Sequence, residues 1–257
     1  MPFDPAIAVV LGGAAVGFLL AVFGGGGSVL AAPVLLYLGG VTDAHVAVGT
    51  ASAAVAANAA LNLLGHWREG RIKWPCATVF ALAGLAGSFV GSSLAKLISG
   101  QHLLLAFALA MAAIGLSMFR KPASEGDPDV NISMKLVARL APLGLLTGLA
   151  AGFFGIGGGF LIVPGLMLAT GMTMANATAS SLLSVALFGA ATSFNYALTG
   201  QVDWRFAGLL LAGGVTGGVA GLFAAKALVR HAALARTLFA VLIIIVAAYV
   251  AWRALAG

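Results

Sequence analysis

Charged side chains are scarce in this sequence. Only 8% of its 257 residues are Asp, Glu, Lys or Arg, whereas 61% are hydrophobic, and the mean hydropathy is +1.10. A soluble globular chain carries roughly 25% charged and roughly 45–50% apolar residues. So few charges cannot cover a surface that faces water, so most of the outside must face lipid. The sequence therefore predicts an integral membrane protein.

Cysteine and catalytic motifs are also scarce, which narrows the function. The single cysteine, Cys76, excludes an internal disulfide. The sequence holds no HExxH zinc motif, no GxxxxGK[ST] phosphate loop and no pair of carboxylates within an apolar run. We therefore expect no enzyme, no cofactor and no metal site. Because Asp43, Glu69 and Asp203 lie at the ends of apolar runs, a proton relay through the membrane would lack an obvious carboxylate.

The net charge of +6 indicates which kinds of partner the chain can have. In a membrane protein an excess of Lys and Arg is typical of cytoplasmic loops, so nucleic acid is not the expected partner. Residues 1–5 lack a positively charged leader, and we expect no cleaved signal peptide. The partners predicted from composition are thus the lipid bilayer and a small solute.

The apolar runs are too long for the short alternating segments of an outer-membrane barrel, so the spans should be helices. In the first half they cover about 6–40, broken at 24–28, then 44–64, 74–97 and 103–119. A polar linker with three Pro or Gly residues occupies 120–135. In the second half the runs cover about 136–171, 175–198, 204–228 and 234–253.

An internal repeat relates these halves. The phrase from Phe23 to Pro33, FGGGGSVLAAP, returns as FGIGGGFLIVP from Phe154 to Pro164, an offset of 131. Further along, Trp74 matches Trp204 at an offset of 130, as do several glycines and the pair of lysines at 96 and 226. The repeat predicts one transmembrane domain made of repeat 1 (1–119), a cytoplasmic linker (120–135) and repeat 2 (136–257).

The glycine-broken run in each half decides the topology. A membrane helix needs about 20 residues, so a run of about 35 is too long for one span and its parts are short for two. Two short helices that meet at the glycine break fit best, as a re-entrant hairpin or as a pair of abbreviated spans. Each half then has five elements, and the second half enters from the opposite side. The fold class predicted is an all-α membrane protein of two inverted repeats.

The distribution of Lys and Arg tests this inversion. In the five-plus-five topology ten of them lie on one side and only Lys96, Arg205 and Arg253 on the other. A four-plus-four topology splits the same residues nine to four. The bias favours inversion in an inner (plasma) membrane, with the linker in the cytoplasm and both termini outside it, and leaves the alternative open.

Both glycine clusters are candidate substrate sites. Glycine frees backbone N–H groups at the start of the next helix, where the helix dipole favours an anion, and lets a ligand approach the backbone. Inverted-repeat transporters place their substrate near the midplane, where we expect the two tips to meet. The alternative is that the glycines only permit close helix packing. The candidates in the clusters are Gly24, Gly25, Gly26, Gly27, Ser28, Gly155, Gly157, Gly158 and Gly159.

Polar stripes on the following helices are the second candidate feature. At 100° per residue each stripe covers about 120° of a helix that is otherwise apolar, so it should face a protein interior or a wet cavity. Interhelical hydrogen bonding is the competing explanation. The candidates are Thr50, Asn58 and Asn62 in the first half and Ser181, Ser184, Thr192 and Asn195 in the second.

Two further matched features have simpler explanations. The glycines at 84, 87 and 91 and at 213–221 have helical spacing and predict packing seams. Lys96 and Lys226 are expected to snorkel at helix ends, with anion attraction as the alternative role.

The pattern GxxxGxxxxxxFGIGGGFLIVP at 144–164, its degenerate copy at 13–33, and the endings at Gly70–Trp74 and Gly200–Trp204 resemble the TauE/SafE sulfite exporter family, also called the toluenesulfonate uptake permeases. The resemblance covers nearly the whole chain. It implies a secondary transporter, in the main an exporter, for sulfite, thiosulfate, sulfoacetate or other organosulfonates, coupled to an ion gradient that is often protons. In the first copy Gly25 stands for Ile156 and Ser28 for Gly159, which would make the site asymmetric.

The sequence thus predicts a transporter that holds a small anion between the glycine tips and the polar stripes and works by alternating access. The alternatives that remain are an anion channel, a permease for another small organic anion, and a non-transporting membrane protein. A homodimer is one assembly that the sequence allows.

Overall fold

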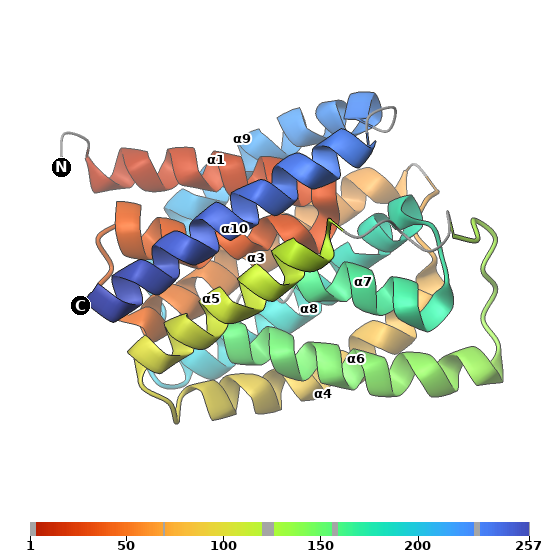
Figure 1. Cartoon of the computed structure of the whole chain (residues 1–257), viewed down its shortest axis with the longest axis horizontal. Helices are drawn as coiled ribbons and strands as arrows, with labels where there is room; N and C mark the ends of the chain where they lie inside the picture. Colours follow the sequence, from red (N-terminus) through yellow and green to blue (C-terminus); the bar gives the residue numbers. More distant parts are fainter. Residues whose placement is uncertain (1–3, 69, 120–125, 156–158, 229–231, 257) are drawn as a thin grey trace.

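The computed structural model describes residues 4–68, 70–119, 126–155, 159–228 and 232–256, with the backbone alone at 160, 226–228, 232–236 and 256. Helices account for almost all of it (Figure 1). Their bounds are α1 Pro5–Phe23, η1 Gly24–Leu30, α2 Ala31–Pro33, η2 Val34–Leu38, α3 Ala44–Trp67, α4 Trp74–Ala95, α5 Gly100–Ser117, α6 Met134–Phe154, α7 Gly159–Thr170, α8 Met174–Ala197, α9 Trp204–Leu228 and α10 Ala232–Ala256. Among these residues the only β pairing is an isolated bridge between Asp127 and Met172.

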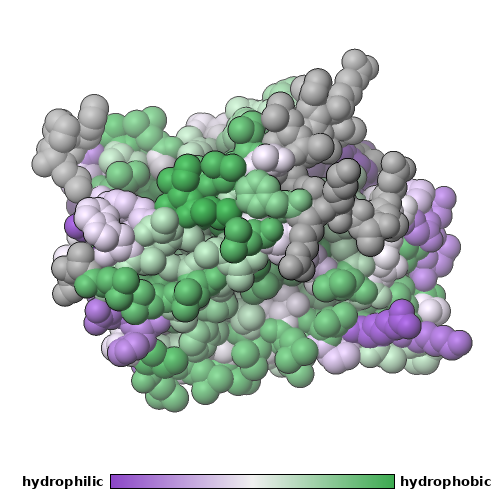
Figure 2. Space-filling model, viewed as in Figure 1, coloured by the Kyte–Doolittle hydropathy of each residue, from purple (hydrophilic) through white to green (hydrophobic). Residues whose placement is uncertain are grey.

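Eight stretches of the described chain are long and apolar enough to cross a membrane, four in each half. The first half supplies Pro5–Leu38, Ala44–Trp67, Trp74–Ala95 and Gly100–Ser117, and the second supplies Met134–Phe154, Met174–Ala197, Trp204–Ala225 and Thr237–Leu255. In Figure 2 hydrophobic atoms cover the middle of the visible face, and hydrophilic atoms gather toward its two ends. The chain is therefore a multi-pass, all-helical membrane protein, as predicted.

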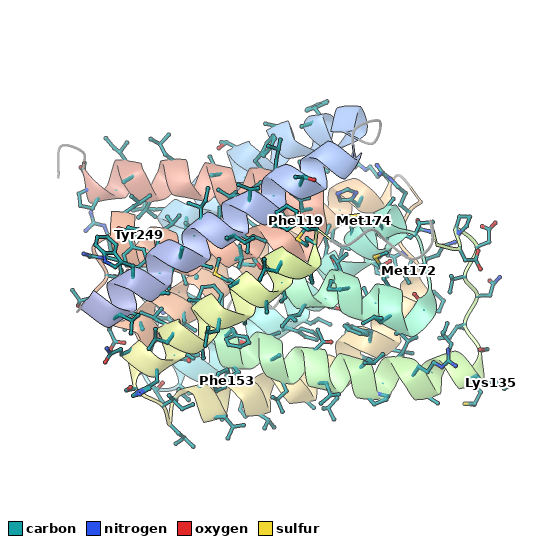
Figure 3. All side chains as sticks on the ribbon, in the orientation of Figure 1. Phe119, Lys135, Phe153, Met172, Met174 and Tyr249 are labelled. Atoms are coloured by element: carbon teal, nitrogen blue, oxygen red, sulfur yellow. The ribbon has the colours of Figure 1, made fainter. Side chains whose placement is uncertain are left out.

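Each glycine-broken run folds back on itself. In the second half, Gly165 of α7 lies against Thr147 of α6, and the Asp127 N–H donates to the Gly171 carbonyl (2.8 Å), which ties the end of α7 to the approach to α6. Figure 3 shows the same return, since α6 runs from Lys135 toward Phe153 and the chain comes back to Met172. The returning helix, α7, has 12 residues and is about 18 Å long, too short to cross a hydrocarbon core of about 30 Å.

The first half has the same hairpin. Val34 lies against Gly12, and Val9 lies against Gly39, so the segment after the break runs back along α1. The start of α1 and the end of α10 lie at one end of the molecule (Figure 1), and Lys135, the last residue of the linker, lies at the other (Figure 3).

The glycines predicted to form packing seams lie where one half packs against the other. α1 packs on α9, and α6 packs on α4. A Cβ on Gly17 would overlap the Gly214 carbonyl, and a Cβ on Gly148 would overlap the Gly84 carbonyl. These two contacts are equivalent under the repeat, because 17 matches 148 and 84 matches 214. Small residues let the backbones approach this closely, which is how helices associate within lipid.

At the centre, α3 packs against α8, and these two spans are the most deeply buried of the eight. A Cβ on Gly49 would lie 2.7 Å from the Cβ of Tyr196, and one on Gly189 would lie 3.0 Å from the Ser52 carbonyl oxygen. The numbers rise on one helix as they fall on the other, so the pair is antiparallel. This pair carries both predicted polar stripes.

Candidate functional site

The first glycine break is held on α8. Gly24 has φ +63°, a conformation that L side chains rarely adopt, and a Cβ there would lie 2.7 Å from Ser181 Oγ. The next N–H, that of Gly25, donates to Ser181 Oγ (3.2 Å), and Ser181 donates in turn to the Thr178 carbonyl (2.8 Å). The structure therefore brings three of the predicted site residues together, and the hydroxyl of Ser181 connects the break to the polar stripe.

The second break is held on α3 in the corresponding way. Gly155 has φ +65°, and a Cβ there would overlap Val48. Its carbonyl accepts a hydrogen bond from Ser52 Oγ. Gly157 and Gly158 lie outside the described residues, and Gly159 is the first residue of α7. Each break thus contacts the polar helix of the opposite half.

The two breaks lie at different depths, whereas we expected their tips to meet. Ser52, which holds the second break, lies against Gly189. Ser181, which holds the first, is eight residues from Gly189, or about 12 Å along the helix. α1 and α6 have 19 and 21 residues, about the length of a full span, so each break lies beyond the middle of the pair.

The rest of the first cluster serves packing. A Cβ on Gly27 would overlap the backbone of Leu20, and one on Gly26 would lie 3.0 Å from the ring of Phe239, which stacks on Phe23 at 4.4 Å. Ser28 donates to the Gly25 carbonyl (2.7 Å). For Gly26 and Gly27 the structure favours the packing alternative, and Ser28 stabilises the turn.

Several stripe residues are committed to interhelical hydrogen bonds. Thr50 Oγ1 accepts from the Asp203 N–H (2.8 Å), and its equivalent in the repeat, Ser180, accepts from the Lys73 N–H (3.0 Å). Thr192 pairs with Ser88 (3.0 Å). For Thr50 and Thr192 the competing explanation, helix-to-helix bonding, describes what the structure contains.

Asn195 belongs to a larger network at the end of α4. Its Nδ2 lies within hydrogen-bonding distance of the Ser92 hydroxyl (2.7 Å) and the Ser93 hydroxyl (2.8 Å), and its Oδ1 accepts from Lys96 Nζ (2.8 Å). The ammonium of Lys96 also lies over the ring of Tyr196, 5.8 Å from its centroid. Lys96 lies at the end of α4, where we expected it to snorkel, and its ammonium is hydrogen-bonded at the α4–α8 interface.

Asn58 and Ser184 differ from all of these. Asn58 is 1% exposed and Ser184 is 0% exposed. Within the described residues, the Asn58 amide has no hydrogen-bond partner at its nitrogen or at its oxygen. The Ser184 hydroxyl has none either. Asn62 donates to the Asn58 backbone carbonyl (3.0 Å) and not to the Asn58 side chain. Buried polar groups are normally paired, so unpaired ones mark a place where another molecule is expected to bind.

These two groups lie at one depth, between the two breaks. Asn58 is six residues from Ser52 and Ser184 is five residues from Gly189, so they lie about 9 Å and about 8 Å from that contact. The Asn58 amide lies against α9, because a Cβ on Gly214 would overlap it. The centre of the candidate site is therefore the middle of the α3–α8 pair, with a backbone turn held on either side.

The site has a notable electrostatic character. No aspartate or glutamate lies within the described parts of the eight spans, and no group of three or more His, Cys, Asp or Glu residues in the described chain could hold a metal ion. Asp43 and Asp203 lie at helix starts, where Asp43 accepts from the His45 N–H (2.8 Å) and Asp203 from the Phe206 N–H (3.0 Å). The donors at the centre are neutral amides and hydroxyls, which can bind an anion without a fixed positive charge.

Sequence reasoning missed Ser52, Ser88 and Ser180, which make bonds across the helices. The repeat itself carried the missing signal, because an offset of 130 pairs Thr50 with Ser180 and Asn58 with Phe188. Phe188 occupies the place in the second half that Asn58 occupies in the first, against Gly84.

Known membrane transporters resemble this chain over most of its length. Residues 9–250 match the family described as sulfite exporter TauE/SafE. A probable membrane transporter protein of Xylella fastidiosa strain 9a5c is 45% identical over 258 aligned residues, which cover 100% of this chain and 99% of that protein. The probable membrane transporter protein YunE of Bacillus subtilis is 27% identical over 84% of this chain and 86% of its own. No solved structure matches the chain. This chain belongs to the TauE/SafE sulfite exporter family of membrane transporters.

Proposed function

We propose that the protein is a secondary transporter, acting as an exporter, for small sulfur-containing anions such as sulfite or organosulfonates. One observation carries the proposal. Two buried and unpaired polar side chains, Asn58 and Ser184, lie midway along the central helix pair, between two backbone turns held on that pair. If these two positions served only the fold, we would expect their polar groups to be paired or replaced by apolar ones, because an unpaired buried polar group costs free energy.

Neutral donors suit a small, singly charged anion. The hydroxyl of Ser184, the amide of Asn58 and the backbone N–H groups near the glycine breaks would replace the water that the anion loses. An anion buried without such partners is strongly disfavoured. A fixed cation at the centre would bind the anion more tightly and slow its release, whereas transport requires both binding and release.

The equivalent seams support alternating access between inverted repeats. Because the α1–α9 and α4–α6 contacts exchange under the repeat, two arrangements of similar energy are available to the chain, one open to each side. Rocking of one set of helices against the other would then move the access point around a fixed site. The excess of Lys and Arg favours a cytoplasmic linker and termini outside the cytoplasm of a plasma membrane.

The test is transport of sulfite, thiosulfate and sulfoacetate by the full chain in proteoliposomes. We expect saturable transport that Asn58→Leu lowers by about tenfold or more, because a site built to hydrogen-bond its substrate loses its selectivity with the polar group. Phe188→Leu is the matched control, since it changes the equivalent place in the other half, and it should keep most of the activity.

Three outcomes are informative. Flux that never saturates would favour a channel. No flux of any sulfur anion through folded protein would remove the sulfur assignment. Equal activity of Asn58→Leu and Phe188→Leu would remove Asn58 from the site.

A further inference from the structure

The unpaired amide of Asn58 has two different sides. Its Nδ2 carries hydrogens and can only donate, and its Oδ1 can only accept. Both atoms are buried, and neither has a partner within the described residues. Whichever way the amide is turned, it offers one donor and one acceptor side by side, so its complement is a group that carries both.

A fully deprotonated oxyanion does not supply that complement. The oxygens of a sulfonate, R–SO₃⁻, are all acceptors, so they would satisfy Nδ2 and leave the lone pairs of Oδ1 facing negative charge. An oxyanion that keeps one proton satisfies both atoms, because its charged oxygen accepts from Nδ2 and its O–H donates to Oδ1. The same rule of pairing makes a site that binds an O–H reject an analogue without it.

We propose that Asn58 selects a singly protonated oxyanion; this rests on the function proposed above and narrows its substrates to oxyanions such as hydrogensulfite, with organosulfonates disfavoured. Asn58 is then a specificity-determining residue.

This selection would also account for how a proton crosses without a carboxylate relay. A substrate that moves in its protonated form carries one proton with it, so the protein needs no acidic group inside the membrane. The nearest titratable groups agree with this. On α3 they are His45 and His66, on α8 Tyr196 and on α9 Arg205, and each lies eight or more residues along its helix from the level of Asn58.

Two probes of the same shape and charge test the proposal at one pH. Methylphosphonate as its monoanion has one O–H, and methanesulfonate has none. We expect the detergent-purified full chain to bind methylphosphonate monoanion about tenfold more tightly in calorimetry, the effect of one hydrogen bond. The comparison uses the wild-type protein, so it does not depend on whether a variant folds.

Two variants connect the preference to the residue. Asn58→Leu should bind the two probes equally, and Asn58→Val repeats the test with a smaller side chain. Phe188→Leu, the matched control, should keep the preference. Thermal unfolding in detergent shows that each variant is folded.

The outcomes separate this inference from the proposed function. If sulfur anions are transported but wild-type protein binds methanesulfonate as tightly as methylphosphonate, the selection by Asn58 is wrong and the transporter stands. The same holds if Asn58→Leu keeps the preference. If neither probe binds and no sulfur anion is transported, both proposals fall together.

Discussion

The two halves of the molecule fill the same place with opposite chemistry. In the first half the amide of Asn58 lies on Gly214, unpaired, and in the second half the ring of Phe188 lies on Gly84. The backbones around them match closely, since both glycines have the same neighbours under the repeat. The difference therefore lies in the side chains alone, and it turns one of two equivalent places into a polar one.

One helical turn further along, the difference continues with compensating sizes. Asn62 lies against Gly218 in the first half, and Thr192 pairs with Ser88 in the second. The large polar residue faces a glycine, and the smaller one faces a serine. Seams that hold backbones together stay equivalent because any added atom would overlap a carbonyl. The central faces can differ between the two halves, because a side chain there has only to fit the available volume and to have its polar atoms paired. A substrate site requires this freedom.

The largest effect is expected at the equivalent seams. Gly17→Val and Gly148→Val should each prevent folding or lower the free energy of unfolding by about 3 kcal/mol, because the side chain would overlap the carbonyl of Gly214 or Gly84. Gly208→Val is the control, since nothing lies within 4 Å of its Cβ. Size-exclusion profiles and thermal unfolding in detergent measure the effect. A much smaller loss of stability in one of the two variants would show that the two seams contribute unequally to the stability of the fold.

The next test exchanges the chemistry at the centre. Phe188→Asn should lower the free energy of unfolding by about 3 kcal/mol, since it removes a buried ring and introduces a second unpaired amide. Asn58→Leu should leave stability unchanged or raise it, because the amide it removes has no bond to lose. Thermal unfolding of both variants gives the sign. Strong destabilisation by Asn58→Leu would mean that the amide is paired in the folded protein.

The breaks themselves give the third comparison. Gly24→Ala and Gly155→Ala each place a side chain at positive φ, which costs about 1–2 kcal/mol. Gly155→Ala should cost about 1 kcal/mol more, because its Cβ would overlap Val48, whereas a Cβ on Gly24 makes the less severe contacts of 2.7 Å with Ser181 Oγ and the Thr178 carbonyl oxygen. Gly200→Ala isolates the backbone term, since its φ is +71° and nothing lies within 4 Å of its Cβ. Equal effects at Gly155 and Gly200 would show that Val48 moves aside freely.

Much of this architecture could be predicted from the sequence, and the reasons are physical. The apolar runs fall within a few residues of the helices, because lipid forces the backbone to bond within each span. The seams were predictable because glycine at helical spacing has few other uses in a span. The depth of the breaks was not predictable, since α1 and α6 are nearly as long as full spans and carry the breaks past each other. Nor did periodicity distinguish Asn58 from Thr50: it gives the face of a helix, and only the partner helix decides whether a polar group on that face is paired.

The smallest effect is expected at the two hydroxyls that hold the breaks. Ser181→Ala removes the bond to the Gly25 N–H, and Ser52→Ala removes the bond to the Gly155 carbonyl. Each should lower the free energy of unfolding by about 0.6 kcal/mol, the usual value of a hydrogen bond between membrane helices. The effects on transport should be larger than this and similar to each other, because each hydroxyl fixes one backbone turn beside the site. Initial rates in proteoliposomes, set against thermal unfolding of the same samples, separate the two quantities. If only one of the two variants slows transport, the turns are unequal partners, and the asymmetry of the centre extends to its backbone.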